Sequence, residues 1–306
     1  MRILVTGGLG LVGSHLVEEC VGRGHETIVL DDKLDGKLEN IAGCLHSPLL
    51  KVLDGDVRDS VNITKASRDA DCVVHLAAMV NVKMSIENPQ LTTEVNVIGT
   101  LNVLRACVEN KVRRVIYAST ASVYPSSRRP QREDCVLESR TPYAASKIAG
   151  EALCKSFASA FRLETIIFRF FNVYGICRSN PNPSVIVRFG ESIKKGESLL
   201  IFGDGHQTRD FVHVSDVADA VELAIENESS DETFNVGTGK QTSINQLASI
   251  FARVNGDSTP RVIHEKTREY EIRHSCADIT KARRLLGYQP RTDLKTGIEE
   301  YLSWAL

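Results

Sequence analysis

A tyrosine and a lysine four positions apart are the clearest candidates for catalytic side chains. Tyr143 and Lys147 occur in the segment Tyr-Ala-Ala-Ser-Lys, at the start of a helical pattern that runs to Phe161, and side chains four apart on a helix project from one face. A phenol with a pKa of about 10 is a poor base at neutral pH, but a nearby positive charge favours the phenolate. Such a pair could take a proton from an alcohol while a hydride leaves its carbon.

Hydroxyl side chains stand upstream of this pair. Ser119, Thr120 and Ser122 lie at the end of an apolar run of strand length, where a hydroxyl could hydrogen-bond the same substrate oxygen as Tyr143. A Tyr-x-x-x-Lys pair by itself also suits an ordinary amphipathic helix start. The chemical interpretation therefore needs a second, independent motif.

That motif is a glycine-rich turn near the beginning of the chain. The segment Gly-Gly-Leu-Gly-Leu-Val-Gly at positions 7–13 lies between a strand-like run and a helical one. Without Cβ atoms, such glycines allow a tight turn, a close approach of the backbone to a pyrophosphate and close packing of the helix, whose first N–H groups would bind the phosphates. The alternative is a tight turn without a ligand. The residues predicted to bind here are Gly7, Gly10, Leu11, Val12 and Gly13.

An aspartate follows the second strand-like run. Asp31 lies at about the distance from the glycines at which an acidic side chain accepts hydrogen bonds from an adenosine ribose. Its charge would repel a 2′-phosphate, which favours NAD over NADP, although Lys33 nearby opposes that preference. The alternative for Asp31 and Asp32 is a solvated turn.

Two further strand ends carry residues that suit the same cofactor. Asp56 could bind the adenine amino group, cap the next helix, or do both, and small residues after the fourth strand let the backbone pass against a ligand. His75, at the end of that buried strand, is predicted to be a structural histidine with satisfied hydrogen bonds. The other cofactor-binding residues predicted here are Val57, Leu76, Ala77 and Ala78.

Strand-like and helical segments alternate along the first half of the chain. This pattern predicts an α/β protein with a Rossmann-like, doubly wound parallel sheet covered by helices on both faces. Residues 1–175 are expected to form the dinucleotide-binding domain, with a core that also receives later returning segments, and residues 176–306 mainly a smaller α/β lid. The strand-like runs are Arg2–Thr6, Glu26–Leu30, Leu49–Leu53, Cys72–Leu76, Arg114–Ser119 and Thr165–Phe170, and the helical patterns include Leu11–Gly22, Thr92–Glu109, Tyr143–Phe161 and Ile244–Val254.

The composition limits the class of protein. Of the 306 residues, 42% are hydrophobic and 25% charged, which excludes a disordered chain, and a net charge of -2 disfavours binding of nucleic acid through a basic surface. No apolar stretch reaches the roughly 18 residues of a membrane span, and the first residues leave no room for a secretory signal. The 8 cysteines are scattered without metal-ligand spacing. These features predict a cytoplasmic protein with reduced thiols, no metal, and no membrane or nucleic-acid partner.

The order of the motifs resembles one family nearly from end to end. The sequence is similar to the extended short-chain dehydrogenases/reductases of the NAD-dependent epimerase/dehydratase family, and most like its UDP-glucose 4-epimerases. The resemblance implies NAD as cofactor, a nucleotide sugar, with a UDP-sugar favoured, as substrate, and a lid that binds it. The segments that carry it include TGGLGLVG at 6–13, STASVY at 119–124, YAASK at 143–147, RFFNVYG at 169–175 and RDFVH at 209–213.

The resemblance also implies roles for single residues near the cofactor. Tyr143 is expected to be the catalytic base, Lys147 its electrostatic partner and a ribose ligand, and Thr120 the hydroxyl beside them. Asn96 matches an asparagine behind the active site, and Phe170 matches an aromatic residue near the nicotinamide.

On the substrate side, the resemblance assigns the diphosphate to Asn172, Arg209 and Arg268. An arginine suits that task because its planar fork matches phosphate oxygens. Glu271 is expected to hold the nucleotide ribose. Ser275 stands where a bulky residue restricts some epimerases to plain hexoses, which predicts that N-acetylhexosamines are accepted as well. The residues expected beside the uracil are Leu200 and Phe202.

The favoured reaction is inversion at C4 of the sugar through a transient 4-keto intermediate, with UDP-glucose and UDP-galactose as the first pair. The family's 4,6-dehydratases carry an Asp-Glu pair directly after the catalytic threonine, where this chain has Ala121 and Ser122. Neither can exchange a proton usefully near neutral pH. A decarboxylase, a reductase and a dinucleotide-sensing regulator without activity remain as alternatives.

The resemblance further implies a homodimer built from two helices of each subunit, 92–109 and 143–161. Both helices carry apolar faces that could form the contact. The alternative is that both helices pack only on the chain's own sheet, and periodicity alone does not separate the two. The residues of the apolar face are Val95, Ile98, Leu101 and Val103.

Overall fold

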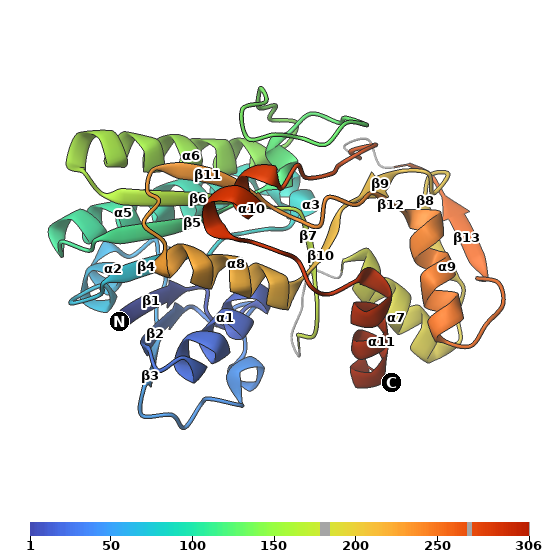
Figure 1. The fold of residues 1–306 in the computed structure, drawn as a ribbon, viewed down its shortest axis with the longest axis horizontal. Helices are drawn as coiled ribbons and strands as arrows, with labels where there is room; N and C mark the ends of the chain where they lie inside the picture. The colour runs from blue at the N-terminus through green and yellow to red at the C-terminus, as the bar shows by residue number, and fades with distance from the viewer. Residues whose placement is uncertain (178–183, 268–270, 306) are drawn as a thin grey trace.

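A seven-stranded sheet forms the centre of the larger lobe in Figure 1. The structure is a computed structural model that describes residues 1–177, 184–267 and 271–305. The strand order is β11-β6-β5-β4-β1-β2-β3, and every neighbouring pair is parallel. The predicted doubly wound parallel sheet is thereby confirmed. The strands are β1 (Arg2–Thr6), β2 (Glu26–Asp31), β3 (Leu50–Asp54), β4 (Cys72–His75), β5 (Arg114–Thr120), β6 (Glu164–Phe170) and β11 (Glu232–Val236).

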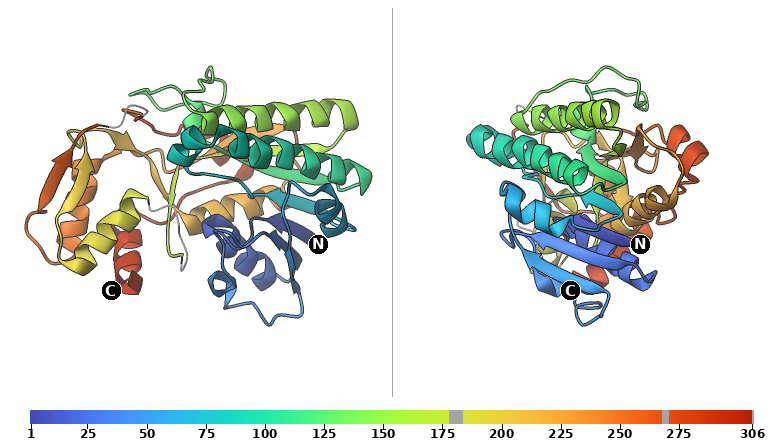
Figure 2. Two further views of the ribbon diagram at one scale, coloured as in Figure 1. Left: turned by 180° about the vertical axis from the view of Figure 1, so that it is seen from behind. Right: turned by 90° about the vertical axis from the view of Figure 1, so that its left-hand side faces the viewer.

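Helices cover both faces of this sheet, as the end-on view in Figure 2 shows. The central strands are buried on both faces, and a parallel sheet between two helical layers therefore needs nearly continuous apolar runs such as Ile3, Leu4 and Val5. One layer holds α1 (Leu11–Gly22), α8 (Val214–Glu226) and α10 (Thr280–Leu286), and the other holds α2 (Ser60–Ala66), α5 (Gly99–Glu109) and α6 (Pro142–Phe161).

The direction of winding reverses between β1 and β4. From β1 the chain continues to β2 and β3 on one side, whereas β4 begins the side that holds β5 and β6. Loops that leave such a switch point diverge, and open α/β sheets bind ligands in the crevice beyond the strand ends there. The glycine turn follows β1, and Leu76 follows β4, so both predicted cofactor segments lie at this crevice.

Segments from late in the sequence return to this sheet. β11 extends it by pairing with β6, with Phe234 opposite Phe168, and α8 packs against α1. Apolar side chains of these segments, such as Val217 and Phe234, belong to the same core as β1. The larger lobe is therefore assembled from both ends of the chain.

A second group of buried side chains forms the core of the smaller lobe, on the right of Figure 1. Phe189 and Phe251 meet edge to face there, with ring centroids 5.6 Å apart. The short strands β7 and β10 pair between the two lobes, and β9 pairs with β12 in the smaller lobe, next to the start of α9 (Figure 1). The elements are α7 (Val185–Lys195), α9 (Ile244–Val254), α11 (Leu294–Ala305), β8 (Leu199–Phe202), β13 (Val262–Glu265), β7 (Asn172–Tyr174), β10 (Phe211–His213), β9 (Thr208–Arg209) and β12 (Thr242–Ser243).

The single helix predicted over 92–109 is interrupted. It consists of α4 (Pro89–Thr93), a π-helical turn (Glu94–Ile98) and α5. Such turns inside α-helices frequently mark functional sites, and this one contains the buried Asn96. The remaining short helices are α3 (Val82–Glu87), η1 (Leu38–Ile41) and η3 (Ala121–Val123).

The residues of the apolar face predicted to form the dimer contact differ in their exposure. Val103 is fully buried in the chain's own core, so its inclusion in an outer face was wrong. Ile98 is 45% exposed, whereas Leu101 is partly buried against the same core. Val95 is half-buried, so Ile98 is the most exposed residue of this face, and the homodimer remains a prediction.

Several chemical properties follow directly from the described residues. None of the eight cysteines, all of which lie in the described ranges, forms a disulfide. No helix in the described ranges is both long and apolar enough to cross a bilayer. The same ranges contain no group of three or more His, Cys, Asp or Glu side chains placed to hold a metal ion.

His75 is a buried structural histidine, as predicted. Its Nδ1 lies 2.8 Å from the Thr6 hydroxyl and its Nε2 lies 3.0 Å from the Thr100 hydroxyl. Burial, together with the charge of Lys147, lowers the pKa of His75 to about 3. The folded chain therefore holds this imidazole neutral at pH values where the unfolded chain protonates it.

This difference predicts a loss of stability in acid. Because the unfolded state binds the extra proton below about pH 6.5, the free energy of unfolding should fall by about 1.4 kcal/mol per pH unit from there down toward pH 3. His75→Gln removes this titration, so its melting temperature should fall less steeply between about pH 6 and 4. Parallel melting curves for the variant and the wild type would contradict the assignment.

Candidate active site

The glycines after β1 have different neighbours. A Cβ on Gly7, whose φ is +70°, would lie 2.7 Å from the backbone nitrogen of Ala77, and one on Gly13 would lie 2.2 Å from the Gly7 carbonyl oxygen. A Cβ on Gly10 would meet only that carbonyl, at an ordinary 3.5 Å. Gly7 therefore lets the loop after β4 approach the turn closely. Gly10, in contrast, leaves the space in front of the helix N-terminus open.

The N-terminus of α1 has no side-chain cap. Gly10 is the N-cap residue, and the first intrahelical bond runs from the Ser14 N–H to the Gly10 carbonyl at 2.9 Å. The N–H groups of Leu11, Val12 and Gly13 are therefore the donors that a helix leaves without an intrahelical partner. With the positive end of the helix dipole, they suit an anion, and this turn fits the pyrophosphate of a dinucleotide.

Asp31 is held in place at the end of β2. Its carboxylate accepts hydrogen bonds from the N–H groups of Leu9 at 3.0 Å and Lys33 at 2.9 Å. Burial raises the pKa of Asp31, and these two hydrogen bonds oppose that rise. The Lys33 ammonium lies 3.0 Å from the Asp54 carboxylate, so the cation that opposed a preference for NAD is paired elsewhere. The site fits a ribose with a free 2′-hydroxyl.

Asp56 does not cap α2, which corrects one of the two roles predicted for it. The cap is Asp59, which accepts a hydrogen bond from the Val61 N–H at 2.8 Å. Asp56 instead accepts a hydrogen bond from Nε of Arg58 at 2.7 Å. Burial acts to raise the pKa of Asp56, but the contacts with Arg58 outweigh it and lower that pKa. Its contact with adenine remains a prediction.

Asn96 joins two segments of the candidate site. Its Oδ1 accepts a hydrogen bond from the Met79 N–H at 2.8 Å, and its Nδ2 donates to the Met79 carbonyl at 3.0 Å and to the Ser146 hydroxyl at 2.9 Å. Both amide donors are used within the chain. Asn96 thus fixes the loop after β4 to α6, next to Lys147, from behind the site.

The start of α6 is well defined. Thr141 caps it by accepting a hydrogen bond from the Ala144 N–H at 3.2 Å, and Pro142 occupies the first turn. The Tyr143 N–H donates to the Ser85 hydroxyl at 3.2 Å. Both members of the candidate pair, Tyr143 and Lys147, are buried.

Lys147 connects α6 to the end of β5. Its ammonium donates to the Ala118 carbonyl at 2.9 Å and lies 5.0 Å from the centre of the Tyr117 ring. Burial lowers the pKa of Lys147 to about 8, so the group still carries its proton at neutral pH. A positive charge is therefore held at the base of the candidate site.

The Thr120 hydroxyl acts on the Tyr143 phenol and favours its ionised form. Burial raises the pKa of Tyr143, and the effect of Thr120 counteracts this only in part. The lowered pKa expected from the neighbouring ammonium is therefore not produced by the chain alone, because the loss of water around the phenol outweighs the favourable contacts. Thr120 also accepts a hydrogen bond from the Ser122 N–H at 3.2 Å.

The strand register links this hydroxyl pair to the substrate side. Thr120 is directly opposite Phe170 in the β5–β6 ladder, and Phe170 is buried against Phe168 with ring centroids 5.9 Å apart. Asn172 follows two residues later on β7, about 7 Å further at the usual rise of a strand. The Thr120 hydroxyl thus lies opposite a residue that is only two positions from Asn172, one of the residues expected to hold the diphosphate.

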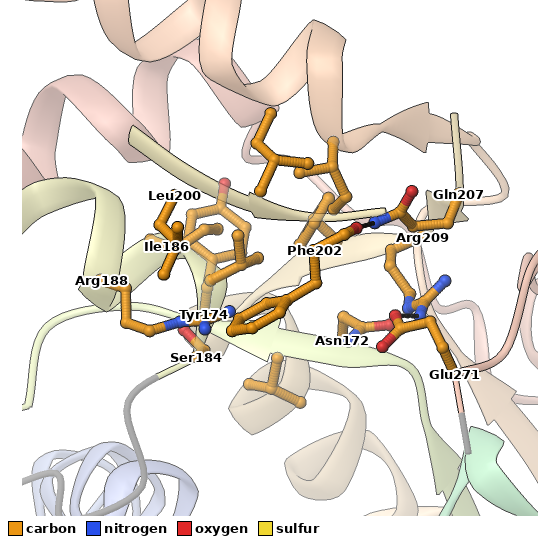
Figure 3. Close-up of a pocket in the computed structure, with 15 residues that line it drawn as sticks. Asn172, Tyr174, Ser184, Ile186, Arg188, Leu200, Phe202, Gln207, Arg209 and Glu271 are labelled. Atoms are coloured by element: carbon orange, nitrogen blue, oxygen red, sulfur yellow. Dashed lines mark hydrogen bonds and ion pairs between the residues drawn. The ribbon is translucent and has the colours of Figure 1, made fainter. Parts of the chain in front are cut away.

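A cavity of about 200 Å³ is bordered by β7, β8 and the start of α7 (Figure 3). It gathers most of the predicted substrate residues: Asn172, Leu200, Phe202, Arg209 and Glu271. Sequence reasoning did not select Tyr174, Ser184, Arg188 and Gln207, which also line it. The guanidinium carbon of Arg188 lies 5.2 Å from the Phe202 ring centre. The sequence feature that could have identified Arg188 is a single positive charge within the apolar run at the start of a helix.

Arg209 and Glu271 form an ion pair inside this cavity, as Figure 3 shows. Arg209 also donates to the Thr208 carbonyl at 2.8 Å. Burial lowers the pKa of Arg209, and the charge of Glu271 opposes this. The second predicted cation, Arg268, lies outside the described residues.

Ser275 does not line the described cavity. Its side chain is buried, and its N–H donates to the Thr208 carbonyl at 3.2 Å. It therefore lies next to the strand that carries Arg209, and its contact with a sugar remains a prediction.

Comparisons with known proteins show which family this chain is similar to. The NAD dependent epimerase/dehydratase family model matches residues 3–237. The UDP-glucose 4-epimerase of Mycolicibacterium smegmatis is 35% identical over 97% of this chain and 96% of its own length. The UDP-N-acetyl-alpha-D-glucosaminuronate decarboxylase of Bacillus cytotoxicus is 33% identical over 99% and 97%, respectively.

Solved structures agree with the fold over its whole length. The UDP-glucose 4-epimerase of Thermotoga maritima, solved with UDP-glucose, has a TM-score of 0.93 and 31% identity, covering 99% of this chain and 98% of that one. The Thermus thermophilus UDP-glucose 4-epimerase complex with NAD has a TM-score of 0.91 and 32% identity, covering 100% and 99%. With the glycine turn at the switch point and the Tyr–Lys pair on α6, these matches show that the chain belongs to the NAD-dependent epimerase/dehydratase family.

Proposed function

We propose that this protein is a 4-epimerase of UDP-hexoses that interconverts UDP-glucose and UDP-galactose through a transient 4-keto sugar. The observation that supports the proposal is the buried Tyr143 phenol on α6, with the Thr120 hydroxyl at the end of β5 acting on it and the charged Lys147 one turn further along α6. This arrangement handles a single proton on a single alcohol. The relatives above act on related sugars by several reactions, and the proposal selects one of them.

NAD, the cofactor of this family, accepts a hydride and returns it when bound. The chain's own part is the movement of a proton at the C4 hydroxyl of the sugar. Thr120 would orient that hydroxyl, Tyr143 would remove its proton, and Lys147 would stabilise the phenolate with its ammonium charge. Because the phenol is buried, positive charge beside it acts more strongly than it would in water.

Inversion also requires that the sugar present both of its faces while the nucleotide stays bound. Asn172 and Arg209 line the cavity beyond the end of β6 and would hold the diphosphate there. Rotation of the sugar about the far end of this anchor would then turn its opposite face toward the cofactor site. A cation held in a buried setting suits such an anchor because charge-assisted hydrogen bonds are stronger than neutral ones.

The residues after Thr120 favour epimerisation over dehydration. Elimination of water across C5 and C6 needs a further acid and base. Ala121 is apolar and buried, and Ser122 is hydrogen-bonded to Thr120 through its N–H. Neither side chain can supply that acid or base.

The test is a panel of nucleotide sugars with the products identified by NMR. UDP-glucose and UDP-galactose should interconvert, and the N-acetylhexosamine pair should react too if Ser275 leaves room for the acetamido group. A 4-keto-6-deoxy product or loss of carbon dioxide from UDP-glucuronate would overturn the proposal in favour of a dehydratase or decarboxylase. Bound NAD without turnover of any sugar would indicate a regulator.

Removal of the Arg209 charge should weaken substrate binding. Arg209→Met removes a charge-assisted contact with the diphosphate, so KM for UDP-glucose should rise about 10- to 100-fold, with a smaller change in kcat. The control is Arg273→Met, since Arg273 is an exposed partner of Asp204 outside the cavity. Steady-state kinetics check both variants, and equal KM values would contradict the assigned anchor.

A further inference from the structure

A buried ion pair lies directly behind the candidate catalytic side chains. Glu151 and Arg169 are each only 2% exposed. The guanidinium meets the carboxylate in two parallel hydrogen bonds, Nε to Oε1 at 2.9 Å and Nη2 to Oε2 at 2.7 Å. The Ser119 hydroxyl donates a third, to Oε1 at 2.6 Å. Three donors on one buried carboxylate form an arrangement with little freedom to move.

The pair joins the three elements that carry the candidate chemistry. Glu151 follows Lys147 by four residues on α6, and Lys147 follows Tyr143 by four, so at about 3.6 residues per turn all three share one face. Ser119 lies on β5 between the carbonyl that holds Lys147 and the hydroxyl that meets Tyr143. Arg169 is opposite Ser119 in the β5–β6 register.

The Arg169 guanidinium also binds the segment that follows β5. Its Nη1 donates to the Tyr124 hydroxyl at 2.7 Å and to the Glu133 carbonyl at 3.0 Å. Tyr124 in turn donates to Asn235 on β11 at 2.8 Å. The short helix that follows Thr120 is thereby tied to β6 and β11, so four of the five guanidinium donors are used.

We propose that Glu151 and Arg169 are positioning residues for the reaction, which fix α6 against the ends of β5 and β6 and so set the places of Tyr143, Thr120 and the Lys147 ammonium. The proposal rests on the proposed function, because it assigns the pair to the same chemistry. It predicts that loss of the pair changes kcat rather than KM, since neither residue lines the substrate cavity.

The charge of Glu151 is also part of this role. The groups around the Lys147 ammonium are Glu151 and Cys154 on its own helix, Tyr117 on β5 and His75 on β4. Of these, Glu151 carries a negative charge and raises the pKa of Lys147, against the lowering by burial. Removing the negative charge of Glu151 leaves the positive charge of Arg169 without its partner. That charge further disfavours the protonated form of Lys147.

The experiment uses Glu151→Gln, and Glu164→Gln serves as its matched control. Glu164 pairs with the buried Arg114 at 2.8 Å across the same two strands, at their opposite ends. Glu151→Gln should lower kcat by about 100-fold with KM within about three-fold of the wild type. In NMR spectra of ¹³C-labelled lysine, Lys147 should titrate at a lower pH than in the wild type.

Glu164→Gln should lower the melting temperature without changing kcat or the Lys147 titration. Equal effects of the two variants on all three measurements would overturn the proposal, because they would show a merely structural role. Glu151→Asp, which keeps the charge, should restore the Lys147 titration and part of kcat. The titration needs no sugar, so a wild type that turns over no nucleotide sugar would reject the proposed function alone.

If Glu151→Gln does not fold, Arg169→Lys tests the same proposal. It keeps both buried charges but loses the fork that reaches Tyr124 and Glu133. A folded Arg169→Lys enzyme should lose about 10-fold in kcat, and a kcat within about two-fold of wild type would overturn the proposal.

Discussion

Tyr143→Phe should lower kcat by about 10²- to 10⁴-fold, the range that a positioned proton-transfer group contributes. The ring stays buried beside Thr120, so packing is kept and only the hydroxyl is lost. NAD should remain bound, because the glycine turn and Asp31 are untouched. Turnover of UDP-galactose and the NAD content of the purified protein measure the two effects separately.

Tyr301→Phe is a suitable control, since Tyr301 is also a buried phenol but belongs to the core of the smaller lobe. Its kcat should equal that of the wild type. A Tyr143→Phe enzyme within about 10-fold of wild-type kcat would mean that another residue moves the proton.

Gly13→Ala is expected to have the largest effect on stability. The new methyl group would lie 2.2 Å from the Gly7 carbonyl oxygen and 2.7 Å from Cα of Gly8. Both neighbours are backbone atoms of a turn that Leu30 and Ala77 hold in place, so the clash cannot be relieved by a rotamer change. Overpacking of this kind typically costs about 1–3 kcal/mol, which should lower the melting temperature by roughly 3–10 °C and weaken NAD binding.

Gly22→Ala is the matched control on the same helix. Gly22 is the last residue of α1, and a Cβ there would meet nothing within 4 Å. Because alanine favours helix by up to about 1 kcal/mol over glycine, this variant should be as stable as the wild type or slightly more so. Thermal unfolding of both variants, with NAD titrated by fluorescence, decides the point; a Gly13→Ala protein that melts with the wild type would show that the turn can shift.

Local patterns in the sequence determined the elements that carry the site. The alternation of β-branched runs with amphipathic segments identified the parallel sheet, because a strand buried on both faces must be apolar throughout. α9 was predicted with its observed bounds, and the structure shows a Ser243–Gln246 capping box at its start. The shared face of Tyr143 and Lys147 followed from helix periodicity alone.

The tertiary structure decided which partner each of these residues has. Asp59, not Asp56, caps α2, and Ala77, from a loop far along the chain, fills the space beside Gly7. Arg209 and Glu271, given separate tasks from the sequence, lie in contact. The spacing of residues along the chain determines the face of a helix or strand on which each side chain lies. Contacts between segments many residues apart arise only when the sheet and its two helical layers assemble.

The same distinction applies to the chemistry. The sequence predicted Tyr143 and Lys147 as a proton-handling pair but not the degree of burial, which raises the pKa of the phenol and lowers that of the ammonium. It likewise gave no reason to select Glu151 and Arg169, because their role exists only where α6 crosses the ends of β5 and β6. Residue type and spacing thus determined which chemical groups the candidate site contains, and the packing of distant segments determined the burial and the charged neighbours of those groups.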